Sequence, residues 1–293
     1  MTFNEDSRVK IPAIVHLTRL GFNYVPKSGI SNIHADTNIF KDLFKQGLSK
    51  INGTAYSDSE IDTFITELNI QLDNSDLGKT FYKSLQGDFA CKLIDLENFD
   101  NNLLHVVTEL TYKNDEEEFR PDIILLINGM PLAFIEVKKP NNREGILAER
   151  NRINTRFKNP KFKKFMNITQ LLVFSNNQEY DEENITPIQG AFYATPDPDQ
   201  VNFNCFREED NSIIHSVPQE DTETEKQILL DNNIVSILGT SEYETAKELN
   251  SPTNRALTSL FSRQRFKTLL RYGFAYVNTV TNGISKIEKH IMR

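Results

Sequence analysis

The sequence contains little cysteine and no long apolar run. Its two cysteines, Cys91 and Cys205, lie far apart and belong to no CxxC pair or histidine cluster. Clusters of that kind build zinc sites, so we expect no such site, and we expect both thiols to be reduced and structural. The N-terminus is polar, and no apolar run approaches the roughly 20 residues that a membrane helix needs. We therefore expect a cytoplasmic protein with no membrane partner.

Positive charge is also scarce over the chain as a whole. Its 293 residues carry a net charge of −8, which argues against a protein that coats nucleic acid by bulk electrostatics. Hydrophobic residues make up 38% and charged residues 25%, as in an ordinary soluble globular protein of one or two domains. The basic residues nevertheless gather in residues 138–164, which hold ten lysines and arginines against two acidic residues. Such a segment is either a solvated face or a surface for DNA.

The hydrophobic pattern predicts both helices and strands. Helical spacing of apolar residues predicts three N-terminal helices, over residues 5–20, 36–47 and 58–70, the last opened by a capping box from Ser57 to Glu60. Alternation predicts strands over residues 79–95 and 103–112. Further along, the pattern predicts a helix over 143–157, a strand over 170–175, loops over 186–225, and helices beyond residue 225, notably at 253–272. This order indicates an α/β fold.

Residues 120–139, RPDIILLINGMPLAFIEVKK, are the most informative segment. Two apolar runs flank an Asn-Gly pair at residues 128–129, which is a strong signal for a β-hairpin turn. Residues two apart on a strand share a face, so Glu136 and Lys138 point to the same side. A turn at this place puts Asp122 opposite the end of the second strand, with Cβ separations of about 5 Å. Two carboxylates and a lysine are therefore predicted to converge.

The two carboxylates predict a metal site. Ionised carboxylates a few ångström apart repel each other, so they take up a proton or bind a cation. Oxygen ligands favour Mg²⁺ or Mn²⁺, completed by water and a substrate phosphate, and the Val137 carbonyl adds one more oxygen. Such a metal acidifies a water for attack on phosphorus, and Lys138 is placed to orient that water or stabilise the developing charge. The alternative is a plain hairpin with a surface Glu-Lys pair, worth about 0–1 kcal/mol.

The same segment resembles a known family. A PD hairpin, an NGxPL turn and an ExK strand are the pattern of the nuclease core in the R subunits of type I restriction enzymes. The helix ending LTRLGFNY, the strand LLVFSNN and the helices leading to GISKIEKHIMR are similar to that family in the same order, so the resemblance covers essentially the whole chain. It implies a restriction-endonuclease-like α/β core, with a mixed central sheet flanked by helices, and a C-terminal helical extension.

The resemblance also implies roles for individual residues. It implies a PD-(D/E)xK endonuclease within a larger, ATP-driven DNA translocase, with Asp122 and Glu136 as metal ligands and Lys138 as the catalytic lysine. The implied substrate is double-stranded DNA, and the implied partners are a methyltransferase (M) subunit and a specificity (S) subunit. Glu5 lies where some such nucleases have another acidic residue, so it is a candidate accessory acid.

One departure from the family concerns the helix after the ExK strand. Many members have a glutamine and a tyrosine four residues apart there, and the corresponding positions here are Arg152 and Arg156. A guanidinium binds phosphate through two parallel hydrogen bonds, so we assign both to phosphate binding; exposed helix arginines are the alternative. The other candidates for DNA binding are basic residues of the same segment: Lys139, Arg143, Lys161, Lys163 and Lys164.

The sequence has no motif for binding the phosphates of ATP. Residues 78–80 read GKT, but Asp73 stands five residues earlier, where a phosphate-binding loop needs glycine. ATP would therefore act only through a motor domain that this chain lacks, and we expect a fragment of the family's subunit. We predict a nuclease domain over residues 1–185, connecting loops and strands over 186–225, and a helical segment over 226–293 that leads into the motor.

The sequence leaves three functions open. The leading one is a metal-dependent endonuclease module without sequence specificity of its own, because no recognition element is evident in the chain. The second is a non-catalytic DNA-binding or docking module that keeps the hairpin but not the activity. The third is a stand-alone repair nuclease of the same fold. Binding of Mg²⁺ or Mn²⁺ that depends on Glu136 distinguishes the first function from the second.

Overall fold

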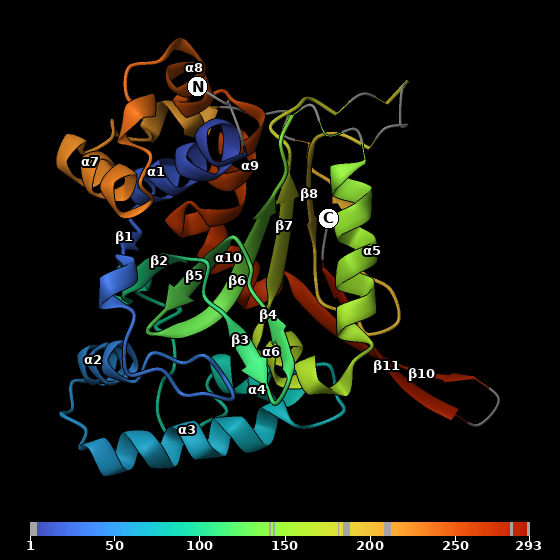
Figure 1. The fold of residues 1–293 in the computed structure, drawn as a ribbon. Coiled ribbons are helices and arrows are strands. Elements are labelled where there is room, and N and C mark those ends of the chain that lie inside the picture. Colours follow the sequence, from blue (N-terminus) through green and yellow to red (C-terminus); the bar gives the residue numbers. More distant parts are fainter. Residues whose placement is uncertain are drawn as a thin grey trace.

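The computed structural model describes residues 5–140, 142, 144–180, 182–183, 188–207, 212–281 and 284–291. Within these residues a central sheet has seven strands, in the order β1 (Asn23–Tyr24), β2 (Leu104–Thr108), β5 (Ile123–Ile127), β6 (Met130–Val137), β7 (Leu171–Ser175), β8 (Ala191–Ala194) and β9 (Asn204–Cys205). The sheet is mixed, because β6 pairs antiparallel with β5 and parallel with β7. Helices pack on both faces (Figure 1). The predicted α/β class, with a mixed sheet flanked by helices, is confirmed.

The β5–β6 hairpin forms as predicted around Asn128 and Gly129. Both residues have positive φ, 48° and 78°, as a two-residue turn of the type favoured by Asn-Gly requires. Gly129 has a second reason to be glycine, since a Cβ there would lie 2.6 Å from the backbone nitrogen of Phe44. The turn is therefore pressed against the helix α2 (Lys41–Asn52), and this contact fixes the hairpin relative to the N-terminal part of the chain.

The N-terminal helices match the prediction closely. A π-helical turn, Asp6–Lys10, runs into α1 (Ile11–Arg19), with Pro12 in the first turn of α1. The helix α3 (Asp58–Leu72) begins at the predicted capping box, in which Ser57 and Glu60 exchange hydrogen bonds. The helix predicted over 36–47 begins only at Lys41, because Asn38 has a positive φ of 55°. In the described part of the chain, no helix combines the length and the apolar composition needed to cross a bilayer.

One strand prediction is wrong. Residues 79–95 were predicted to form a strand, but their first part is a helix, α4 (Lys79–Leu85), followed by turns. The buried residues Phe81, Tyr82 and Leu85 have the spacing of one helix face, and Asp76 accepts hydrogen bonds from Thr80 at the start of the helix. The strand predicted over 103–112 is confirmed only for β2, and a separate hairpin of β3 (Tyr112–Asn114) and β4 (Glu117–Phe119) follows it.

The elements beside the hairpin agree with the prediction. The helix predicted over 143–157 is α5 (Gly145–Phe157), and the strand predicted over 170–175 is β7. A short helix, α6 (Lys163–Ile168), lies between them. The predicted loop region 186–225 includes β8 and β9, which extend the central sheet beyond β7.

The C-terminal part is helical as predicted only as far as Tyr272. It contains α7 (Thr222–Asp231), α8 (Ser241–Lys247), α9 (Pro252–Phe261) and α10 (Arg263–Tyr272). The helical prediction is wrong for the described residues after it, because β10 (Phe274–Thr281) and β11 (Ile284–Ile291) form an antiparallel hairpin that projects from the body (Figure 1). The base of this hairpin is anchored by Lys289, whose buried ammonium donates to the side-chain oxygen of Gln170 at 3.0 Å.

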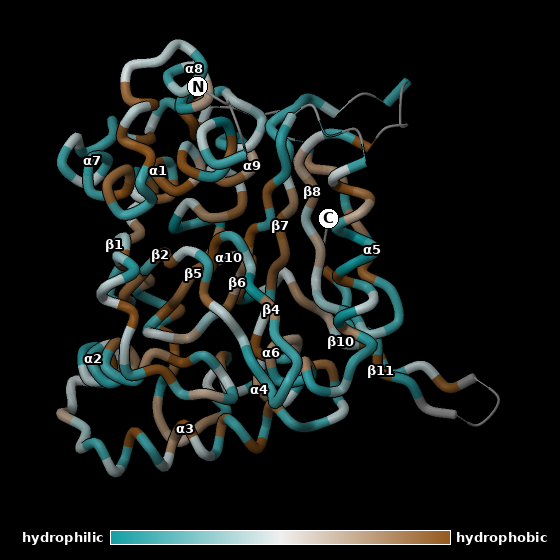
Figure 2. The backbone as a smooth tube through the Cα atoms, viewed as in Figure 1, coloured by the Kyte–Doolittle hydropathy of each residue, from teal (hydrophilic) through white to brown (hydrophobic). Residues whose placement is uncertain are grey.

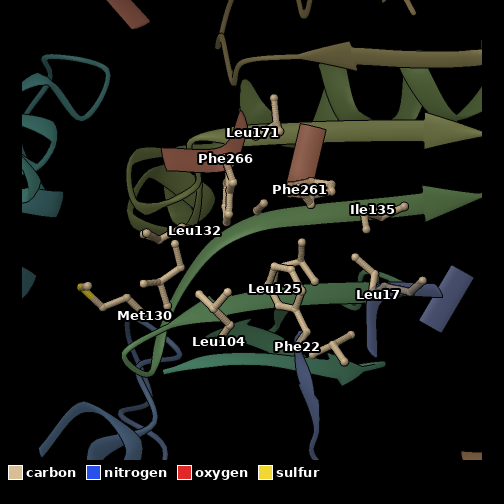
Figure 3. Packing of buried hydrophobic residues seen from close by; sticks show 14 of the residues in the cluster. Leu17, Phe22, Leu104, Leu125, Met130, Leu132, Ile135, Leu171, Phe261 and Phe266 are labelled. Atoms are coloured by element: carbon tan, nitrogen blue, oxygen red, sulfur yellow. The ribbon is translucent and has the colours of Figure 1, made fainter. Parts of the chain in front are cut away.

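The core lies on both faces of the central strands, which carry the most hydrophobic residues (Figure 2). On one face, side chains of β5, β6 and β7 meet α1, α9 and α10, as Leu125, Ile135, Leu17 and Phe261 illustrate (Figure 3). The other face packs against α5 and α6. The C-terminal helices thus share a core with the sheet, while the division of the chain at residues 185 and 225 stays a prediction.

Candidate active site

The predicted site residues meet at the end of the β5–β6 hairpin that is remote from its turn. Asp122 directly precedes β5, and Glu136 and Lys138 lie at the end of β6. The backbone N–H of Val137 donates to Asp122 Oδ2 at 2.9 Å, and Lys138 Nζ donates to Glu136 Oε1 at 3.2 Å. The structure therefore brings Asp122, Glu136 and Lys138 together, as the hairpin register predicted.

Glu136 is buried and short of partners, whereas Asp122 is half-buried. Glu136 is only 5% exposed, and its Oε2 atom has no hydrogen-bond partner among the described residues. Burial, followed by repulsion from Asp122 and Glu149, raises the pKa of Glu136 to about 8. Burial also raises the pKa of Asp122, against the opposing effects of the Val137 hydrogen bond and the Lys138 charge. Negative charge at this place is therefore incompletely compensated by the protein.

Lys138 is the principal cation inside the site. Its Nζ atom donates to the Val137 carbonyl at 2.8 Å, and it lies 3.5 Å from Glu149 Oε2. Burial alone would lower the pKa of Lys138, but Glu136 and the other nearby carboxylates raise it above its ordinary value. The side chain therefore remains an ammonium ion. Its backbone is held as well, because the N–H of Lys138 donates to the carbonyl of Ser175 in β7 at 2.8 Å.

Glu149 is a site residue that the sequence analysis missed. It lies on α5, is fully buried, and forms ion pairs with Arg152 at 2.8 Å and Arg156 at 3.5 Å, in addition to Lys138. The sequence pattern could have predicted this burial, because Glu149 lies between Ile146 and Ile153 on the apolar face of the helix. A carboxylate in an apolar stripe is rarely buried unless it is paired, and that pattern identifies it as a candidate.

The two arginines that depart from the family pattern both contact Glu149. Arg152 is half-exposed, whereas Arg156 is less exposed and its guanidinium carbon lies 4.2 Å from the centre of the Phe119 ring. They are thus joined to the site through one carboxylate rather than standing apart as exposed helix arginines. Their assignment to phosphate binding stays a prediction.

The other predicted DNA-binding residues lie among acidic partners. Three lysines near α6 form ion pairs with aspartates distant in the sequence, at 2.8–3.1 Å: Lys161 with Asp115, Lys163 with Asp73, and Lys164 with Asp36. The positive charge counted along residues 138–164 is therefore partly neutralised by tertiary contacts. Lys139 directly follows the site, and Arg143 lies outside the described residues. Their role in DNA binding stays a prediction.

The N-terminal turn contacts the segment that carries Lys138 and Lys139. Glu5 accepts a hydrogen bond from the backbone N–H of Lys139 at 3.2 Å, and burial raises the pKa of this carboxyl group. Lys10, in the same turn, is buried and pairs with Glu109 at 2.6 Å. The backbone N–H of Glu109 in turn donates to the Asp122 carbonyl at 3.1 Å. The candidate accessory acid is thus brought next to the site, and a partly buried ion pair supports the backbone of Asp122.

The donor set fits a hard divalent ion that keeps several waters. Asp122, Glu136 and the Val137 carbonyl are the oxygens that could hold it, and the unpartnered Oε2 atom of Glu136 is an available ligand. No group of three or more His, Cys, Asp or Glu side chains in the described ranges has the arrangement of a protein-only metal site. Two carboxylates with water and a substrate phosphate match the way Mg²⁺ is commonly bound.

Comparisons with known proteins identify the family. The model described as type I restriction enzyme R protein N terminus matches residues 2–181. The type I restriction enzyme MjaIXP endonuclease subunit of Methanocaldococcus jannaschii is 28% identical over 200 residues, a match that covers 60% of this chain but only 19% of that protein. The MjaVIIP endonuclease subunit of the same organism is 45% identical over 47 residues, which are 16% of this chain and 4% of that protein. The chain belongs to the family of type I restriction enzyme R protein N termini, as its motifs indicated.

Proposed function

We propose that this chain is the nuclease module of a type I restriction enzyme R subunit, and that it hydrolyses phosphodiesters of double-stranded DNA with Mg²⁺ or Mn²⁺. The observation that carries the proposal is the convergence of Asp122, Glu136 and Lys138 in a buried place where negative charge lacks a partner. The mixed sheet that presents them supports a restriction-endonuclease-like core. Family membership supports the same reaction.

Each residue of the proposed site has a separate role in hydrolysis. A bound divalent ion supplies Lewis acidity and lowers the pKa of a water. Asp122, oriented by the Val137 N–H, and Glu136, held by the sheet, fix the position of that ion. Lys138 contributes an ammonium group that orients the attacking water or stabilises charge on the phosphate. Glu5 is placed to accept a hydrogen bond from water or to add a further carboxylate on the side of the N-terminal turn.

DNA would approach along α5 and the segment after β6. Arg152 is half-exposed and pairs with Glu149 of the site, and Arg156 pairs with the same carboxylate. Phosphate contacts of this kind position a duplex without reading its sequence. We therefore propose that the M and S subunits of the complex supply specificity, that ATP acts only through the motor, and that the module works in the cytoplasm.

Cleavage by the full complex tests the assignment of the site. Asp122→Ala and Lys138→Ala should each lower the rate of DNA cleavage by about 10³-fold or more, while ATP-driven translocation continues. The exposed Lys50, on α2, provides a charge-matched control for Lys138→Ala, and Lys50→Ala should leave cleavage unchanged. Cleavage that survives either site substitution would show that the chemistry lies elsewhere.

Metal binding separates a nuclease from a module that only binds DNA. Titration calorimetry of the 293-residue chain with Mn²⁺ should show binding that Glu136→Ala abolishes. If the chain binds DNA with a steep salt dependence but no Mn²⁺, the non-catalytic docking module is the better description.

A further inference from the structure

The Lys138 ammonium contacts two oxygens of the proposed metal site. Lys138 Nζ contacts the Val137 carbonyl at 2.8 Å and Glu136 Oε1 at 3.2 Å. These are two of the oxygens that the proposed function assigns to the divalent ion. An ammonium group and a metal ion cannot bind the same two oxygens at once, because two cations at that distance would overlap and repel each other. Entry of the metal therefore requires Lys138 to give up these contacts.

A displaced ammonium needs another acceptor, because an unpaired buried charge is costly. Glu149 Oε2 lies 3.5 Å from Lys138 Nζ; it pairs with Arg152 Nη1 at 2.8 Å but accepts no hydrogen bond of good geometry within the described part of the chain, so it can still accept one from the ammonium. A charge-assisted hydrogen bond is about 2.8 Å long, so a shift of about 0.7 Å of the ammonium would complete one. Rotation of the long lysine side chain is sufficient for such a shift.

Glu149 itself is held in place. Its side chain is fully buried on α5, between Ile146 and Ile153, which pack into the core beneath the helix. Arg152 and Arg156 pair with its carboxylate from the outer side. The carboxylate is therefore held in a fixed position toward which the lysine can turn.

We propose that the Lys138 ammonium competes with the divalent ion for the Glu136 and Val137 oxygens, and that Glu149 is the positioning residue that receives the ammonium when the ion binds. The inference rests on the proposed metal-dependent function and adds a role for Glu149. It also explains how the lysine stays beside the metal during the reaction, since the move toward Glu149 is short.

A double-mutant cycle measured by Mn²⁺ calorimetry on the 293-residue chain tests the inference without any cleavage assay. Lys138→Met removes the competitor, so Mn²⁺ should bind about tenfold more tightly. Glu149→Gln removes the acceptor of the ammonium, so in the wild-type background Mn²⁺ should bind about tenfold more weakly. In the Lys138→Met background, Glu149→Gln should have almost no effect, because no ammonium remains to be received.

Each alternative role of Glu149 gives a different result in the cycle. If Glu149 is a direct metal ligand, or if it acts only through its charge, Glu149→Gln weakens Mn²⁺ binding equally in both backgrounds, and the inference is overturned. If neither the wild-type chain nor the Lys138→Met variant binds Mn²⁺, both the proposed function and the inference about Glu149 are overturned. Binding that requires Glu136 but shows an additive cycle would overturn the inference alone.

Matched controls separate the specific effects from changes in net charge or folding. Lys158→Met removes a lysine at the exposed end of α5, and Glu144→Gln removes an exposed carboxylate at its start; neither should change the affinity for Mn²⁺. Circular dichroism and urea unfolding establish that each variant is folded. If Glu149→Gln does not fold, Glu149→Asp, which keeps the charge but moves it away from Lys138, should still weaken Mn²⁺ binding, and an unchanged affinity would contradict the inference.

Discussion

Two buried groups of charged residues in this molecule differ in how completely they are paired. The first, here called the α7–α8 cluster, consists of Arg19, Glu220, Glu225 and Lys247, with the Tyr243 hydroxyl beside them. Lys247 Nζ donates to Glu225 Oε1 at 2.7 Å and to Glu220 Oε1 at 3.1 Å, and Arg19 binds the other oxygen of Glu220. Burial opposes ionisation of Glu220, but hydrogen bonds from the backbone, Lys247 and Arg19 lower its pKa to about 2.

The second group, here called the active-site cluster, consists of Asp122, Glu136, Lys138 and Glu149. Lys138 pairs with Glu136 and Glu149, while Arg152 and Arg156 pair only with Glu149, and Glu136 Oε2 has no hydrogen bond in the described structure. The pKa of Glu136 is accordingly raised to about 8, mainly by burial. In the α7–α8 cluster each of the two carboxylates is paired with a cation, although Arg19 Nε has no hydrogen-bond partner in the described structure. The missing partner of Glu136 Oε2 supports the proposal that a cation or substrate is held at this place.

The largest expected effect comes from unbalancing the α7–α8 cluster. Lys247→Met leaves the buried Glu225 without its cation and removes one of the two cations that pair with the half-buried Glu220, so the free energy of unfolding should fall by about 3–5 kcal/mol. Urea unfolding followed by circular dichroism measures the change. Lys226→Met, which breaks an exposed pair with Glu223, is the control and should cost about 0–1 kcal/mol. Equal losses in the two variants would contradict the view that the cluster is a structural network.

In the active-site cluster, removing a charged group is expected to raise the free energy of unfolding, whereas Lys247→Met lowers it. Because the folded-state pKa of Glu136, about 8, lies above its ordinary 4.5, the folded protein holds an extra proton between these values and loses stability as pH rises through them. In EDTA at pH 8, Glu136→Gln should raise the free energy of unfolding by about 2 kcal/mol. The gain should vanish near pH 5, a value close to the ordinary pKa of a glutamate. Destabilisation at pH 8 would show that Glu136 is already well paired.

A bound metal ion should pair the carboxylates of the active-site cluster more completely and thereby stabilise the folded protein. At a free Mg²⁺ concentration about ten times its dissociation constant, the unfolding free energy should rise by about 1.4 kcal/mol. The melting temperature of the unchanged chain should increase accordingly, whereas that of Glu136→Gln should not. An equal increase in both proteins would place the stabilising ion outside the active-site cluster.

The smallest effect on stability is expected at the edge of the active-site cluster. Arg152 is half-exposed, so Arg152→Ala should change the free energy of unfolding by less than about 1 kcal/mol. If Arg152 contacts a DNA phosphate, the slope of log affinity against log salt should fall by about 0.9. Lys50→Ala, an exposed change on α2, should leave that slope unaltered. An unchanged slope for Arg152→Ala would leave the arginine as a partner of Glu149 only.

Sequence reasoning succeeded where local geometry decides the structure. The Asn-Gly turn, the two-residue repeat of a strand and the capping box of α3 each depend on residues that are close in sequence. They were sufficient to bring Asp122, Glu136 and Lys138 to one place. They failed at α4 and at the β10–β11 hairpin, where short apolar runs allow either element and packing against α6, α10 and the sheet selects one.

The sequence by itself determined the hairpin and the three residues that it aligns, because register and alternation follow from the backbone. Only the tertiary structure decided which charges surround them. Glu149 reaches the site from α5, Glu5 and Lys10 reach it from the N-terminal turn, and distant aspartates pair the lysines near α6. Electrostatic balance depends on distances through space, and those distances are set by the packing of the whole chain.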